Sequence, residues 1–171
     1  MIATPALIIF GCAVLILRPA ATWTAVLMTA AVGVVGLLAR VPPTPGPRPS
    51  APRWLLIVAI GVMAFVVARV WFAGVPSPFS FFAVGANVLA GVAEELFFRR
   101  LTYGWLARWG AGIAVIGSAC VFTLVHVPSY GVAALPVDFT AGLLFGWQRW
   151  SGGGWSGPAV THVAANLLQM G

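Results

Sequence analysis

The chain has 171 residues, of which 61% are hydrophobic and only 7% are charged. A soluble domain has about 25% charged residues, so this composition excludes a soluble domain and predicts a membrane protein. The nine basic residues are all arginine and the net charge is +6. They are scattered over loops and helix ends without the basic stripe of a nucleic-acid-binding protein, so we expect no nucleic-acid partner.

Seven hydrophobic segments follow one another along the chain, and most approach the ~20 residues that cross a bilayer as a helix. They cover residues 2–17, 20–39, 54–75, 82–105, 110–127, 137–150 and 156–170. The proline-rich residues 41–53 predict an extended loop. Gly152–Gly154 predict another loop, and Ser156-Gly157-Pro158 is a typical helix start, with Ser156 as the cap. We therefore predict an all-α, multi-pass transmembrane bundle of about seven spans, forming a single membrane domain over residues 1–171.

The arginines also indicate an orientation in the cell membrane. Cytoplasmic loops are enriched in basic residues. One set of helix ends carries Arg40, Arg48, Arg53, Arg108 and Arg149, whereas the other carries Arg18. This asymmetry predicts a cytoplasmic N-terminus.

Glu94 and Glu95 are two of the three acidic residues in the chain, and both lie inside the fourth hydrophobic segment. A charged carboxylate at the bilayer centre costs ~2.5–3.5 kcal/mol even on the lenient insertion scales, so such groups must pair, face a wet cavity or do chemistry. Arg99 follows Glu95 by four residues on the same helix face, where the two can form an ion pair.

The only two histidines, His126 and His162, also lie in hydrophobic segments. Gly110 marks a turn 16 residues after Glu94 and 16 residues before His126, so both lie ~24 Å along a helix from it and can meet. His162 is less easily brought to this depth. Either the loop at 151–155 dips inward, or the sixth segment crosses the membrane only partly.

Three motifs on successive segments resemble those of a known family. Glu94-Glu95 with Arg99 matches EExxxR, Phe122 with His126 matches FxxxH, and His162 with Asn166 matches HxxxN. Together they resemble the CPBP intramembrane proteases, which include CAAX prenyl endopeptidases and bacterial relatives linked to bacteriocin processing and self-immunity (Abi). The resemblance implies a catalytic core at residues 82–171, with accessory helices and the proline-rich loop at 1–81.

The resemblance implies an intramembrane endopeptidase that cuts a peptide or protein substrate near the membrane surface, among membrane lipids. Glu94 with His126 would activate a water as general base, and His162 with Asn166 would stabilise the oxyanion. Glu95 and Arg99 would support this site as an ion pair, and Phe122 would pack beside the water. Metal-assisted hydrolysis stays open, with Glu94, His126 and His162 holding one divalent ion such as zinc. The cofactor is therefore either absent or one such metal.

Three other functions remain open from the sequence. The first is a catalytically silent membrane scaffold or immunity protein. The second is a haem protein with His126 and His162 as axial ligands, and the third is a proton-coupled carrier that uses Glu94 as its relay. A rhomboid-type serine protease is rejected although residues 154–157 spell GxSG, because no histidine follows on a separate, later helix.

The remaining polar residues are expected to have structural roles. Arg69 and Arg100 are interpreted as snorkelling side chains and Asp138 as a helix cap. Asn87 is a candidate for supporting the site. The two cysteines, Cys12 and Cys120, are expected to be small buried hydrophobic residues.

Overall fold

The computed structural model describes residues 4–19, 22–42, 49–71 and 79–170. Every element in these ranges is a helix, which confirms the all-α fold class. The longer helices are α1 (Thr4–Ile16), α2 (Trp23–Leu38), α3 (Ala51–Trp71), α4 (Phe81–Glu95), α6 (Ala111–Tyr130), α7 (Leu135–Gly152) and α8 (Ser156–Leu168). A π-helix at Leu96–Thr102, the short α5 (Tyr103–Leu106) and a 3-10 turn at Ala107–Trp109 continue α4, and another 3-10 turn at Val132–Ala134 precedes α7.

Three helical segments among the described residues are long and apolar enough to cross a membrane: Ala51–Trp71, the continuous Phe81–Trp109, and Ala111–Tyr130. The helices α1 and α2 are apolar but shorter. The protein is thus a helical membrane protein, and the count of about seven crossings stays a prediction.

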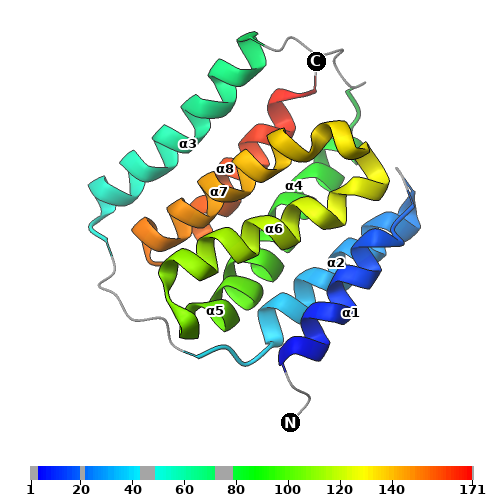
Figure 1. The fold of residues 1–171 in the computed structure, drawn as a ribbon. Coiled ribbons are helices and arrows are strands. Elements are labelled where there is room, and N and C mark those ends of the chain that lie inside the picture. The colour runs from blue at the N-terminus through cyan, green and yellow to red at the C-terminus, as the bar shows by residue number, and fades with distance from the viewer. Residues whose placement is uncertain (1–3, 20–21, 43–48, 72–78, 171) are drawn as a thin grey trace.

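The helices form a bundle with α4 and α6–α8 at its centre (Figure 1). The pair α1 and α2 packs on one flank, where α2 contacts α4 and α1 contacts α6. On the opposite flank α3 packs against α7 and α8. Gln148 of α7 joins these three helices, because its amide nitrogen donates to the Ile57 carbonyl at 2.9 Å and to Thr161 Oγ1 at 2.8 Å.

The apolar core lies around the π-helix. Phe97, Phe98 and Leu101 of this segment are fully buried and pack with Phe122 of α6 and Phe145 of α7. Many large apolar side chains of the outer helices are instead exposed at the surface of the bundle, as expected where lipid is the solvent.

Several predicted boundaries shift in the structure. The helix α3 begins at Ala51, inside the segment expected to be an extended loop, because Pro52 is compatible with the first turn of a helix. Residues 43–48 of that loop and 72–75 of the third predicted span lie outside the described residues. The helix α6 continues through Pro128 to Tyr130 before it ends at Gly131, which has a φ of 76°.

Two predicted helix caps are wrong. The helix α8 does begin at Ser156, but its cap position is Trp155 and no side chain makes a capping hydrogen bond there. The cap position of α7 is Ala134, also without such a bond, and Asp138 lies in the first turn of that helix. Asp138 instead lines a pocket beside the two histidines.

The expected roles of the arginines and of one cysteine also need correction. The snorkelling interpretation is replaced by capping of helix C-termini, since Arg69 Nε donates to the Leu168 carbonyl at 3.2 Å and Arg100 Nη1 to the carbonyls of Gly36 and Ala39. Arg149, interpreted as a helix-end arginine, is buried and donates from Nε to the Arg99 carbonyl at 3.0 Å. Cys120 is exposed on α6, contrary to expectation, whereas Cys12 is partly buried.

Candidate active site

Glu94 is buried at the end of α4 and its two carboxylate oxygens face different helices. Oε2 lies 3.5 Å from His126 Nε2 of α6, as the equal spacing from Gly110 predicts. Oε1 lies 3.2 Å from Nη1 of Arg18, which follows α1. The same nitrogen donates to Thr29 Oγ1 of α2 at 3.0 Å. Glu94 therefore has a histidine on one oxygen and an arginine on the other.

Glu95, fully buried, makes a second and separate set of contacts. His162 Nδ1 of α8 lies 2.8 Å from its Oε1. Arg99 Nη1 donates to the same oxygen at 3.3 Å, which confirms the pairing expected from the four-residue spacing. Arg99 Nε and Glu95 Oε2 are also 3.3 Å apart, but they are not aligned for a hydrogen bond.

The guanidinium of Arg99 is enclosed by aromatic rings. Its central carbon lies 4.8 Å from the Phe122 ring centroid and 5.1 Å from that of Phe145. Nη2 donates to the Gly142 carbonyl at 3.0 Å. Charge–ring attraction and a carboxylate partner together compensate for taking this cation out of water. Arg99 thus ties Glu95 to α6 and α7.

The π-helix begins directly after the two glutamates. Its five-residue spacing is visible in the hydrogen bond from the Tyr103 N–H to the Phe98 carbonyl. Such π-helical turns are rare and are frequently found at functional sites. This segment buries both Phe97 and Phe98 while Arg99 still reaches back to Glu95. No sequence pattern signalled it.

A close approach of α4 and α8 brings His162 to the site. A Cβ at Gly91 would lie 2.8 Å from a methyl group of Val163 and 3.0 Å from its backbone nitrogen, so only glycine fits there. His162 stacks on Phe145 in α7, with ring centroids 4.8 Å apart. His162 and Phe145 lie only ~10 Å along their helices from the α7–α8 turn, whereas His126 lies ~24 Å along its helix from Gly110. Since His162 still contacts Glu95 and His126 contacts Glu94, the α7–α8 turn lies nearer to the two glutamates than the turn at Gly110 does.

The hydrogen bonds of both imidazole rings determine where their protons lie. His126 Nδ1 is 2.7 Å from the Phe122 carbonyl, which can only accept, so Nδ1 carries a proton. His126 Nε2 therefore faces Glu94. In His162 the carboxylate of Glu95 accepts from Nδ1, so Nε2 is left for the pocket side of the ring.

Two pockets are lined by residues that contact the glutamates. One, of about 310 Å³, is lined by polar side chains from four helices, among them Asn87, His126, Asp138, His162 and Asn166. Asn166 Nδ2 donates one N–H to the Asn87 carbonyl at 3.2 Å, and an amide nitrogen has two. Asn87, a sequence candidate for a supporting role, therefore holds the amide of Asn166 through its backbone.

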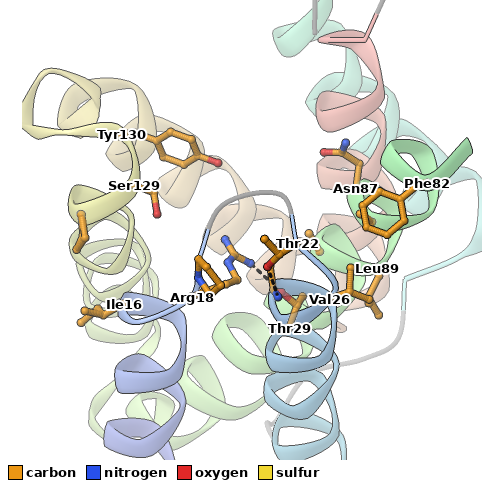
Figure 2. A pocket seen from close by; sticks show the side chains of 15 residues that line it. Ile16, Arg18, Thr22, Val26, Thr29, Phe82, Asn87, Leu89, Ser129 and Tyr130 are labelled. Carbon is orange, nitrogen blue, oxygen red and sulfur yellow. Dashed lines mark hydrogen bonds between the residues drawn. The ribbon is translucent and has the colours of Figure 1, made fainter. Parts of the chain in front are cut away.

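The second pocket, of about 450 Å³, lies at the end of α1 and α2 and is shown in Figure 2. Arg18 and Thr29 lie at its base, and Ser129 and Tyr130 of α6 face Asn87 of α4 across it. Asn87 and Tyr130 line both pockets, so these two residues form the boundary between them.

The structure arranges the two glutamates and the two histidines as two neighbouring pairs, Glu94 with His126 and Glu95 with His162, and both histidines line the same pocket with Asn166. Among the residues that the structure describes, no three His, Cys, Asp or Glu side chains come close enough together to hold a metal ion. Glu94, His126 and His162 therefore do not fit the zinc site considered above, because His162 is engaged by Glu95.

Sequence reasoning missed Arg18, Thr29 and Tyr130. The sequence assigns Arg18 only a role in membrane orientation, and it gives no role to Thr29, a polar residue within the second hydrophobic segment. A polar residue inside a membrane segment needs a hydrogen-bonding partner there, so its presence alone indicates a polar contact with another helix. Its partner was not predictable from spacing along one helix.

Comparison with known proteins gave one family match. The family model described as type II CAAX prenyl endopeptidase Rce1-like matches residues 76–168, just over half of the chain. The matched part contains both glutamates, both histidines and Asn166, and it excludes α1, α2 and α3. No curated protein and no solved structure matches the chain.

Proposed function

Because this chain belongs to the type II CAAX prenyl endopeptidase Rce1-like family, we propose that it is a multi-pass intramembrane endopeptidase that uses Glu94 and His126 to activate a water. The observation that carries the proposal is the approach of Glu94 Oε2 to His126 Nε2 at 3.5 Å at the margin of a polar pocket. The substrate is a peptide that reaches the site from the membrane or its surface.

The pair Glu94–His126 supplies the general base. His126 keeps its Nδ1 proton on the Phe122 carbonyl, so Nε2 presents a lone pair beside the carboxylate oxygen. A water that donates to both acceptors is oriented with its own lone pair directed at the substrate carbonyl. The base accepts the water proton as the oxygen–carbon bond forms, and then delivers it to the leaving amine.

His162 and Asn166 supply the donors for the tetrahedral oxyanion. The second N–H of Asn166 remains for the substrate, because the Asn87 carbonyl accepts only one. The carboxylate of Glu95 accepts the Nδ1 proton of His162, so Nε2 is the ring nitrogen that donates to the oxyanion. Such preorganised donors stabilise negative charge where it develops in the transition state.

Glu95, Arg99 and Phe122 hold these donors in place without touching the substrate. Arg99 neutralises Glu95. The centroid of the Phe122 ring lies 4.5 Å from that of His126 and 5.9 Å from that of His162. Residues 82–171 then form the catalytic core, and the N-terminus lies in the cytoplasm.

The decisive experiment is a cleavage assay on purified protein in lipid nanodiscs. The probe is a farnesylated peptide with a C-terminal CAAX sequence, with the same peptide lacking the lipid as the second arm. We expect Glu94→Gln and His126→Gln to lower kcat by about 10²–10⁴-fold, the usual contribution of a general base. Cys120→Ala, at an exposed site on α6, is the control and should retain full activity. Full activity of folded Glu94→Gln protein would overturn the assignment.

Sensitivity to chelators distinguishes the two forms of hydrolysis considered from the sequence. Since the three residues do not form a metal site, we expect 1,10-phenanthroline and EDTA to leave cleavage unchanged. Loss of activity that is restored by added Zn²⁺ would contradict the metal-free mechanism while leaving the peptidase assignment intact.

A further inference from the structure

We propose that Arg18 is a positioning residue for Glu94, supplied by a part of the chain that lies outside the family-matched residues 76–168. The inference rests on the proposed function, because it assigns Arg18 to the carboxylate that activates the water. It gives the α1–α2 pair a role in the site in addition to its packing.

One nitrogen of Arg18, which follows α1, contacts acceptors on two helices, Thr29 on α2 and Glu94 on α4. Arg18 Nη1 lies 3.2 Å from Glu94 Oε1 and 3.0 Å from Thr29 Oγ1. The side chains of Arg18 and Glu94 are 16% and 4% exposed, so the pair is largely withdrawn from solvent. Thr29 is also buried, at 4% exposed, and its hydroxyl restrains the guanidinium. Figure 2 shows this contact between Arg18 and Thr29 as a dashed line.

The pairing determines which way the carboxylate of Glu94 faces. With Oε1 held by Arg18, Oε2 is the oxygen that remains beside His126 Nε2 at 3.5 Å. A carboxylate without this restraint rotates about its last torsion, which is broad and two-fold. A general base must be oriented to within a few tenths of an ångström to be effective.

The pairing also places a positive charge directly beside the carboxylate of Glu94. The charged or titratable groups that act on it from the surrounding elements are Arg18, His126, His162, Arg99, Tyr130 and Asp138, together with its neighbour Glu95. Arg99 is engaged by Glu95. Arg18 is thus the arginine in direct contact with Glu94, and its removal leaves a buried carboxylate with only an imidazole at hand.

The test is the pH dependence of kcat/KM for the farnesylated peptide. In Arg18→Gln the carboxylate loses a cation that favours its ionised form, so the acidic limb of the profile moves to higher pH. Thr29→Val keeps the charge and removes one restraint, so it lowers kcat roughly fivefold with a smaller movement of the limb. Arg53→Gln, which removes an exposed arginine from the first turn of α3, is the matched control and leaves the profile unchanged.

An unchanged profile in Arg18→Gln overturns the inference, even if the variant is less stable, because a purely structural role does not move the limb. Should Arg18→Gln fail to fold, the kcat values of Arg18→Lys and Thr29→Val test the inference instead. A drop in kcat in both supports the inference, and wild-type kinetics in both overturn it.

A second measurement does not depend on catalysis. Dicyclohexylcarbodiimide modifies protonated carboxyl groups in apolar surroundings, and mass spectrometry of the peptide containing Glu94 gives the pH of half-modification. We expect this pH to rise in Arg18→Gln and to stay unchanged in Arg53→Gln. Absence of cleavage in the wild-type protein would refute the proposed function alone, and the modification data would still decide whether Arg18 controls Glu94.

Discussion

His162 Nδ1 lies 2.8 Å from Oε1 of Glu95, although 67 residues separate the two along the chain. The last helix therefore closes on the second glutamate, while the first glutamate contacts His126 and Arg18. Two adjacent residues thus belong to two different pairs. Because successive residues on a helix point about 100° apart, the pair Glu94–Glu95 can serve both.

The first prediction concerns the donor for the oxyanion. Asn166→Ala removes the amide that remains available to the substrate, so we expect kcat to fall by about 10²–10³-fold with little change in KM. Asn87→Ala is the matched control, because Asn87 holds Asn166 through its backbone carbonyl and the substitution retains it. Initial rates over a range of peptide concentrations give both constants. Equal losses of kcat in the two variants would contradict the assignment of Asn166.

The second prediction concerns the buried ion pair. Arg99→Met leaves Glu95 as an uncompensated buried charge beside His162, so we expect a loss of about 3–5 kcal/mol in unfolding free energy. Glu95→Gln combined with Arg99→Met removes both charges and should recover much of that loss, while activity stays low because Nδ1 of His162 no longer faces a carboxylate. Unfolding in mixed micelles measures the cycle. Strictly additive losses would show that the two residues do not stabilise each other.

The third prediction concerns the contact between α4 and α8. Gly91→Ala places a Cβ against Val163, next to His162, so we expect a loss of stability of about 1–3 kcal/mol and a reduced kcat. Gly85→Ala on the same helix meets nothing within 4 Å. There alanine has the higher helix propensity, so stability should be unchanged or rise by up to about 1 kcal/mol. Thermal unfolding in detergent compares the two variants, and equal effects would rule out the close helix contact.

The fourth prediction concerns the aromatic ring between the histidines. Phe122→Leu keeps an apolar side chain but removes ring contacts to His126, His162 and Arg99. We expect a loss of about 1–3 kcal/mol in stability, as for other imperfect core replacements, together with lower kcat. Phe81→Leu changes a side chain that is 88% exposed and should alter neither quantity. Unchanged kcat in Phe122→Leu would mean that this ring does not position the imidazoles.

The local parts of the site follow from the sequence. Glu95 and Arg99 pair because residues four apart share a helix face, and this contact requires no other helix. Glu94 and His126 meet because equal numbers of residues separate them from the turn at Gly110, where φ is 114°. In the first case the repeat of the helix predicts the contact itself, and in the second it predicts that the two residues lie at matching depth.

The π-helix and the buried arginines did not follow from the sequence. The sequence of residues 96–102, LFFRRLT, is compatible with α- and π-helical hydrogen bonding alike, so the choice depends on how Phe97, Phe98 and Arg99 pack. From the sequence, Arg100 is expected to be a snorkelling side chain and Arg149 a helix-end residue. In the structure, backbone carbonyls of other segments accept their hydrogen bonds.

The sequence by itself determined the fold class, the membrane setting, the contact of Glu95 with Arg99 and the matching depth of Glu94 and His126. The tertiary structure decided that His162 joins Glu95 and that Arg18 joins Glu94. The physical reason is that both contacts join helices whose relative rotation and depth are set by side-chain packing, such as the close approach at Gly91. Helical periodicity specifies which residues share a face, but it does not specify which face of another helix that face meets.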